Sequence, residues 1–220
     1  GGCQKSLDLK PKDQISDASF CQRPEDFQLA ATAFYYGLRE VPQTGIDNAD
    51  VRYIDNNADI SFGTGANAVS NGSYLPAASS PVWDSAYKQI RGINYLLEKA
   101  SQSQLGSALD RWVGEALFFR AYNYFRLVSA FGGVPKIDKV LDITSPELYT
   151  PRASQKEIID FLLSDLENAA EKLPEQGALG ETELGRVTRG AALALRARAA
   201  LYMGTWAKYH HEGDAAGYID

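Results

Sequence analysis

The stretch 41–81 interleaves aromatic side chains with carboxylates and carboxamides. Its aromatic residues include Tyr53, Phe62 and Tyr74. The polar residues among them are Asp55, Asn56, Asn57, Asp59, Asn67 and Asn71. Flat ring faces pack against the C–H patches of a pyranose ring, while oxygens and amides hydrogen-bond its hydroxyls. These residue types therefore suit a hydroxyl-rich ligand such as a sugar.

The same stretch also has a purely structural interpretation. Tyr53 and Phe62 can pin it to a core, and Asn and Asp are common turn formers. Trp83, which follows the stretch, shares a helical stripe with Tyr87, and this spacing favours a place in the core. Both interpretations stay open, and the candidate ligand-binding residues are Tyr53, Asp55, Asn56, Asn71, Tyr74 and Trp83.

A calcium loop is the metal site that the stretch comes nearest to encoding. Asp55, Asn57 and Asp59 match the opening D-x-N-x-D of such a loop. Ile60 then stands where the loop needs glycine, and Ala66 stands where it needs a bidentate glutamate. We therefore predict no metal site.

Residues with catalytic chemistry lack suitable partners elsewhere in the sequence. His210 and His211 are the only histidines, and adjacent residues point in different directions, so they suit a solvated loop better than a metal site. Glu181 and Glu183 fall in a polar loop without the apolar pocket that raises a carboxyl pKa for glycoside hydrolysis. We predict a protein that is not an enzyme and has no catalytic residues and no cofactor.

Composition and charge exclude several further classes of protein. The formal net charge of −6 opposes binding to a phosphate backbone, so nucleic acid is not expected as a partner. The most apolar stretch, 112–134, contains Glu115, Arg120 and Arg126 and is not predicted to span a membrane. Two cysteines, Cys3 and Cys21, are too few for a disulfide framework.

Apolar residues that recur every three or four positions predict an all-α fold of antiparallel helix pairs. Ser154 and Glu157 form a capping box at the start of one helix, and Thr188 can cap another. Glu115 and Arg120 lie inside the most apolar helix, where buried ion pairs or backbone contacts explain them better than catalysis. The expected helices are 24–39, 81–100, 109–131, 155–173 and 189–203, with the start of another at 213–214.

One long block of sequence resembles a known family. Residues 114–128 read GEALFFRAYNYFRLV, and FGGVP follows at 131–135. This block is similar to the signature helix and loop of the SusD/RagB family of Bacteroidetes surface lipoproteins. Further pieces occur in the family's order: LDLKP at 7–11, Trp83 with Tyr87, Ile90 and Asn94, Asp165-Leu166 with Ala169 and Leu173, GRVTRGA at 185–191 and LYMG at 201–204.

The resemblance implies a tetratricopeptide-like helical-repeat scaffold that binds oligosaccharides and presents them to a SusC-like TonB-dependent transporter for uptake. The variable stretch 41–81 would contribute to the ligand face. Family members usually run well beyond 220 residues, so the domain at 24–220 is expected to be the N-terminal part of a longer protein. Ala197, Tyr202, Gly204 and Trp206 fit the repeat pattern only in part, because the period is irregular.

Cys3 lies near the start of a predicted extended, polar leader at 1–23. This is where the lipid-bearing cysteine of a bacterial lipoprotein stands after removal of its signal peptide, and such a lipid would anchor the protein at the cell surface in the outer membrane. A cysteine that merely lies near the start of the sequence is the competing interpretation. Lipidation of Cys3 is thus a prediction about localisation.

Two other functions compete with glycan binding. A helical-repeat adaptor can bind a protein or peptide on its concave face without binding any sugar, and an acidic surface favours a basic partner. A hydrolase is the weaker alternative, because no carboxylate pair has a suitable environment.

Overall fold

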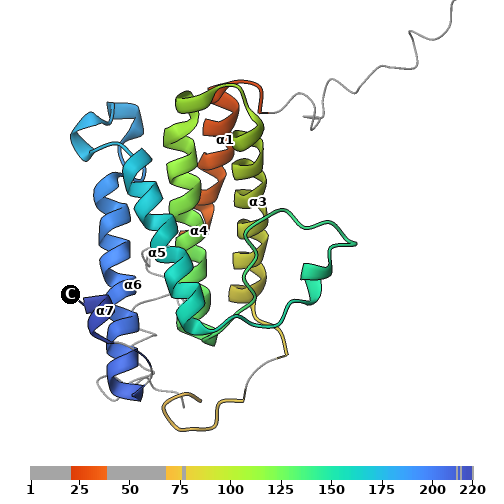
Figure 1. Ribbon diagram of the computed structural model, residues 1–220, viewed down its shortest axis with the longest axis vertical. Helices are drawn as coiled ribbons and strands as arrows, with labels where there is room; N and C mark the ends of the chain where they lie inside the picture. The colour runs from red at the N-terminus through yellow and green to blue at the C-terminus, as the bar shows by residue number, and fades with distance from the viewer. Residues whose placement is uncertain (1–20, 39–67, 76–77, 212, 214, 220) are drawn as a thin grey trace, which may run out of the picture.

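The computed structural model describes residues 21–38, 68–75, 78–211, 213 and 215–219. Every regular element in these residues is a helix, as the sequence predicts (Figure 1). The longest helices are α3, Pro81–Gln102, α4, Asp110–Phe131, α5, Gln155–Lys172, and α6, Arg189–His210. No described helix combines the length and the hydropathy that a membrane span requires.

α1, Pro24–Phe34, is shorter than expected. Proline suits its first turn, and its buried residues Phe27, Ala31 and Phe34 recur with helical spacing. The chain then tightens into a 3-10 turn, η1, Tyr35–Gly37, and leaves the helix at Leu38, which is extended. The low helix propensity of glycine accounts for the early end.

α4 is the central helix of the fold. It packs against α1, α3 and α5: its fully buried Phe119 meets Phe34 of α1, and its fully buried Tyr124 meets Phe161 of α5. The helix ends at Gly132, whose φ of +67° favours glycine over any other residue, and Pro135 follows. Both the apolar character all round and the stop agree with the sequence prediction.

α5 and α6 extend the layer on the other side of α4. The predicted capping box at the start of α5 is present: the Ser154 side chain accepts from the Glu157 N–H, and the Glu157 carboxylate accepts from the Ser154 N–H. Thr188 caps α6 as predicted. A four-residue helix, α7, Ala216–Ile219, then packs beside α6.

The predicted end of α6 at Gly204 is wrong. The helix continues to His210, and His211 ends it in the left-handed conformation with φ of +56°. Gly204 is buried in this helix, and the rings of Trp206 and His210 stack with centroids 4.0 Å apart beyond it. These contacts outweigh the roughly 1 kcal/mol by which glycine disfavours a helix interior.

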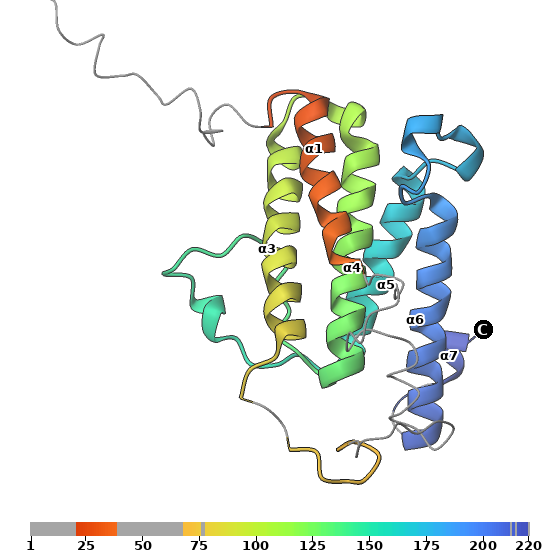
Figure 2. The same cartoon turned by 180° about the vertical axis from the view of Figure 1, so that it is seen from behind.

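The helices alternate in direction, so four helix ends meet at one end of the bundle (Figures 1 and 2). α3 and α5 begin at this end, while α4 and α6 finish there. The segment 68–75, which precedes α3, lies at the same end. We call this the loop end of the bundle.

Glu115, a charged residue of α4 that the sequence singles out, pairs with the partly buried Arg186. The Glu115 carboxylate, which is fully buried, accepts two hydrogen bonds from Arg186 at 2.9 and 2.7 Å and one from the Tyr35 hydroxyl at 3.0 Å. The same hydroxyl accepts from the Val187 N–H at 2.8 Å. This network joins η1, α4 and the segment before α6, and it confirms the expectation of a buried ion pair.

Candidate functional site

Half of the predicted ligand-binding residues can be placed. Tyr53, Asp55 and Asn56 lie outside the described residues, as do Cys3 and the calcium-like residues at 55–59. Asn71 and Tyr74 lie on the segment 68–75, and Trp83 lies in the first turn of α3. The residues that can be placed therefore share the loop end of the bundle.

Asn71 shapes its own loop. Its side-chain oxygen accepts hydrogen bonds from the Ser73 N–H at 2.9 Å and from the Ser73 hydroxyl at 2.7 Å. This is the turn-forming role of asparagine. Tyr74, in contrast, is 60% exposed and can present its ring to a ligand.

Trp83 is half-buried in an aromatic cluster. Its ring centroid lies 5.1 Å from that of Tyr87 and 5.2 Å from that of Phe131, with the Phe131 ring edge-on. The Arg152 guanidinium lies 5.2 Å from the indole centroid. The stripe shared with Tyr87 thus packs as the helical spacing predicts, and Trp83 is held from several sides.

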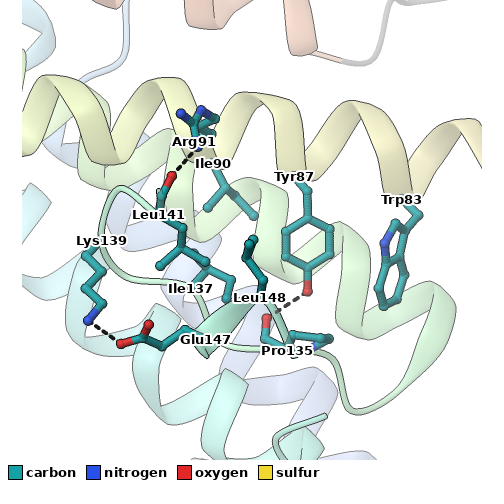
Figure 3. A pocket seen from close by; sticks show the side chains of 10 residues that line it. All are labelled: Trp83, Tyr87, Ile90, Arg91, Pro135, Ile137, Lys139, Leu141, Glu147 and Leu148. Carbon is teal, nitrogen blue, oxygen red and sulfur yellow. Dashed lines mark hydrogen bonds and ion pairs between the residues drawn. The ribbon is translucent and has the colours of Figure 1, made fainter. Parts of the chain in front are cut away.

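A hollow of about 320 Å³ opens next to Trp83, between α3 and the crossing segment 132–154 that joins α4 to α5 (Figure 3). We call it the α3 hollow. Its lining is mostly apolar, and the crossing segment contributes a short 3-10 turn, η3, Pro146–Tyr149, to its wall. The lining residues are Trp83, Tyr87, Ile90, Arg91, Pro135, Ile137, Lys139, Leu141, Glu147 and Leu148.

The polar side chains in this lining have internal partners. The Tyr87 hydroxyl donates to the Pro135 carbonyl at 2.7 Å, and Arg91 Nη1 donates to the Leu141 carbonyl at 2.7 Å. Burial raises the pKa of Tyr87 well above its ordinary value, which keeps the hydroxyl protonated. Lys139 and Glu147 form an ion pair, which raises the pKa of the lysine and lowers that of the glutamate.

A second buried network attaches the crossing segment to the helices of the core. Arg120 donates to both carboxylate oxygens of Asp165 at 2.7 and 2.8 Å and to Asn94 Oδ1 at 3.0 Å. Asn94 Nδ2 in turn donates to the carbonyls of Ile137 and Lys139 at 3.0 and 3.1 Å. The predicted buried partner of Arg120 is therefore Asp165, and the network fixes the wall of the α3 hollow.

Asp165 has no sign of a catalytic role. Burial raises its pKa above the ordinary value, and the hydrogen bonds from Arg120 act against that rise. Arg120, which is 8% exposed, stands between the carboxylate and the crossing segment. The pair is a buried internal support that links α4, α5 and the crossing segment.

The other two candidate acids are Glu181, which is exposed, and Glu183, which is ion-paired. Glu183 pairs with Arg111 at 2.7 Å, and this contact lowers its pKa, so the carboxyl group is ionised at neutral pH. Among the residues that the structure describes, no group of three or more His, Cys, Asp or Glu side chains is placed to hold a metal ion.

Sequence reasoning missed a second ring cluster at the loop end. The sequence predicts that the helix stops at Gly204 and that His210 lies in a solvated loop, so it does not predict that the rings beyond Gly204 share a helix face. In the structure they lie on α6 and line a shallow hollow of about 270 Å³, which we call the α6 hollow. It is lined by Tyr202, Thr205, Trp206, Tyr209 and His210. The spacing of four between Tyr202, Trp206 and His210 is the signal that could have found it.

Comparison with known proteins places the chain in one family. A SusD-like family model, described as "Starch-binding associating with outer membrane", matches residues 7–201. A SusD-like protein of Formosa agariphila is 29% identical over 178 residues, which are 78% of this chain and 34% of that protein. A SusD-like protein of Bacteroides ovatus is 24% identical over 212 residues, which are 91% of this chain and 36% of that protein.

Solved structures give the same result. A SusD-like protein of Bacteroides fragilis is 30% identical with a TM-score of 0.70, covering 96% of this chain and 40% of that one. A laminarin-binding SusD-like protein is 25% identical with a TM-score of 0.67, covering 82% of this chain and 40% of that one. The chain therefore spans 34% of the first of these curated relatives and 40% of the solved ones.

Proposed function

The chain belongs to the SusD-like family, and we propose that it binds an oligosaccharide at the outer membrane and presents it to a TonB-dependent transporter. The family binds carbohydrate and is associated with the outer membrane in Bacteroidetes. The observation that carries the proposal is the match of its starch-binding model to residues 7–201. Lipidation of Cys3 is the proposed means of attachment.

The exposed rings at the loop end support glycan binding. Tyr74 and Tyr209 are 60% and 73% exposed, and both belong to the end of the bundle where the variable stretch joins α3. Ring faces favour the C–H patches of a sugar, and phenolic hydroxyls can donate to or accept from sugar hydroxyls.

Isothermal titration calorimetry of the 220-residue protein tests the proposal. Laminarihexaose and maltohexaose are the first probes, since a relative is described as laminarin-binding and the family model as starch-binding. We expect saturable heat with at least one of them and unchanged oligosaccharide length after overnight incubation. Absence of heat with both at millimolar concentration contradicts binding, and shortened products point to a hydrolase instead.

The projecting part of the crossing segment supports a second candidate function, that of a protein adaptor. Ile143 and Tyr149 are 92% and 90% exposed, and Leu148 beside them is half exposed. Apolar side chains gathered on a projecting turn suit contact with another protein. Co-purification of the transporter from outer membranes, lost on replacing Ile143 and Tyr149 with serine while sugar binding persists, separates the partner surface from the glycan surface.

A further inference from the structure

We propose that the α6 hollow is a carbohydrate-contact site that receives a pyranose ring of a neutral oligosaccharide. This inference rests on the proposed function and assigns part of it to residues outside the variable stretch 41–81. The site is built from Tyr202, Thr205, Trp206, Tyr209 and His210, all on the last three turns of α6.

The position of the α6 hollow is the first argument. The last turn of α6 and the first turn of α3 lie at the same end of the bundle, on opposite sides of it (Figures 1 and 2), so Trp206 and Tyr209 share that end with Tyr74 and Trp83. A ligand bound by the segment 68–75 thus approaches the end of the molecule where the α6 rings are. An oligosaccharide, unlike a small metabolite, is long enough to contact two surfaces at one end of a domain.

The rings of the α6 hollow are held in place before any ligand binds. The Tyr202 ring meets Phe125 edge-on at 5.6 Å, and its hydroxyl accepts a hydrogen bond from Gln155 Nε2 at 3.3 Å. Trp206 lies 6.3 Å from Tyr202 and stacks with His210 at 4.0 Å, with planes 22° apart. Ordered rings reduce the entropy that binding costs.

The chemistry of the surface favours a sugar over a charged ligand. The surface of the hollow is mostly apolar and four of its five lining residues carry rings, which suits the C–H face of a pyranose. Tyr209 is 73% exposed, so its hydroxyl can reach a ligand, and the Lys208 ammonium lies 5.8 Å from its ring as a further donor. In the α3 hollow, by contrast, the Tyr87 hydroxyl and the Arg91 guanidinium already donate to backbone carbonyls.

The three tryptophans of the chain make the test specific. Trp206 reports on the α6 hollow, Trp83 on the α3 hollow, and Trp112, which is 8% exposed in the core, serves as the internal reference. In the ¹H–¹⁵N spectrum of the labelled protein, Trp83→Phe and Trp206→Phe assign the indole N–H signals. Titration with laminarihexaose and with maltohexaose should shift the Trp206 signal to saturation and leave the Trp112 signal in place.

Two tyrosine variants measure how much the α6 hollow contributes to oligosaccharide affinity. Tyr209→Ala should weaken binding of the same oligosaccharide three- to tenfold, the loss expected for one aromatic contact of about 0.6 to 1.4 kcal/mol. Tyr36→Ala removes a 92% exposed tyrosine on η1 and should leave the affinity unchanged.

The outcomes separate this inference from the proposed function. If binding is saturable but the Trp206 indole signal does not shift and Tyr209→Ala keeps the parent's affinity, the inference is overturned and glycan binding remains. Absence of binding to both oligosaccharides overturns the two together. A Trp206 shift that saturates with the calorimetric heat, accompanied by loss of affinity in Tyr209→Ala alone, supports both.

Discussion

The α3 hollow and the α6 hollow both contain aromatic rings, but their polar groups do different things. Around the α3 hollow, the Tyr87 hydroxyl and the Arg91 guanidinium each hold a carbonyl of the crossing segment. Around the α6 hollow, Tyr209 projects 73% exposed. The polar groups of the α3 hollow therefore hydrogen-bond within the protein, whereas the exposed ring and hydroxyl of Tyr209 in the α6 hollow are accessible to a ligand.

An aromatic residue that lines a hollow is therefore not by itself a ligand contact. Among the predicted site residues that the structure describes, Trp83 has the most aromatic partners, and the cluster around it packs against the crossing segment. Tyr209 was not predicted at all, yet its exposure makes it the better candidate for a sugar. Mutations that separate stability from binding can break or sharpen this contrast.

The largest effect is expected in the network behind the α3 hollow. Asp165→Asn leaves the buried Arg120 without its countercharge and should lower the free energy of unfolding by about 3 to 5 kcal/mol, measured by urea denaturation. Glu175→Gln also removes one carboxylate of an ion pair, but Glu175 and Arg189 are exposed, so it should cost less than about 1 kcal/mol. Equal losses in the two variants contradict the support role of Asp165.

Gly133→Ala tests how tightly the crossing segment is held. A Cβ at this position would lie 2.4 Å from the Ala153 carbonyl oxygen, a backbone atom that cannot rotate away. We expect a loss of about 2 kcal/mol in unfolding free energy. Gly177→Ala, where a Cβ would meet nothing within 4 Å, should stay within about 0.5 kcal/mol of the parent, and a similar result for Gly133 would show a looser segment.

A pair of tyrosines sharpens the comparison between the two surfaces. The fully buried Tyr124 hydroxyl donates to the Ile137 carbonyl and accepts from the Ile137 N–H, and burial raises its pKa to about 12. Tyr124→Phe leaves the Ile137 N–H without its partner, while Asn94 Nδ2 still donates to the Ile137 carbonyl, and it should cost about 1 to 3 kcal/mol by urea denaturation. Tyr209→Phe should cost less than about 0.5 kcal/mol, because its hydroxyl faces solvent. A costly Tyr209→Phe would assign that residue to the fold.

The smallest effect is a pH dependence at the start of α5. Hydrogen bonds from the Ser154 N–H and hydroxyl lower the pKa of Glu157 below its ordinary value of 4.5. The ionised form therefore stabilises the fold above that value, and its contribution disappears as the pH falls through the lowered pKa. The stability difference between the parent and Glu157→Gln should be larger at pH 7 than at pH 3, and an unchanged difference would exclude this role.

Local signals predicted the helices well where a cap or a breaker marks the end. Ser154 with Glu157 fixed the start of α5, and Gly132 before Pro135 fixed the end of α4. Gly204 misled because a glycine inside a helix has the same local appearance as one after it. Whether the helix continues past Gly204 depends on ring contacts and burial, and the residue type alone does not show these.

The charged residues of α4 show the same limit of prediction from local sequence. An apolar helix predicts that Glu115 and Arg120 need partners, since a buried charge without one is costly. It does not say which, because Asp165 lies 45 residues from Arg120 and Arg186 lies 71 residues from Glu115. Composition singles out Asn71 and Tyr74 as candidates, whereas the α6 hollow depends on a helix boundary that the sequence placed too early.

A crystal structure of the 220-residue protein with laminarihexaose would show which of the two hollows binds the sugar. We expect density for a sugar ring in contact with Trp206 and Tyr209 at the loop end of the bundle, and none in the α3 hollow. Density confined to the α3 hollow, with both α6 rings left uncovered, would contradict it.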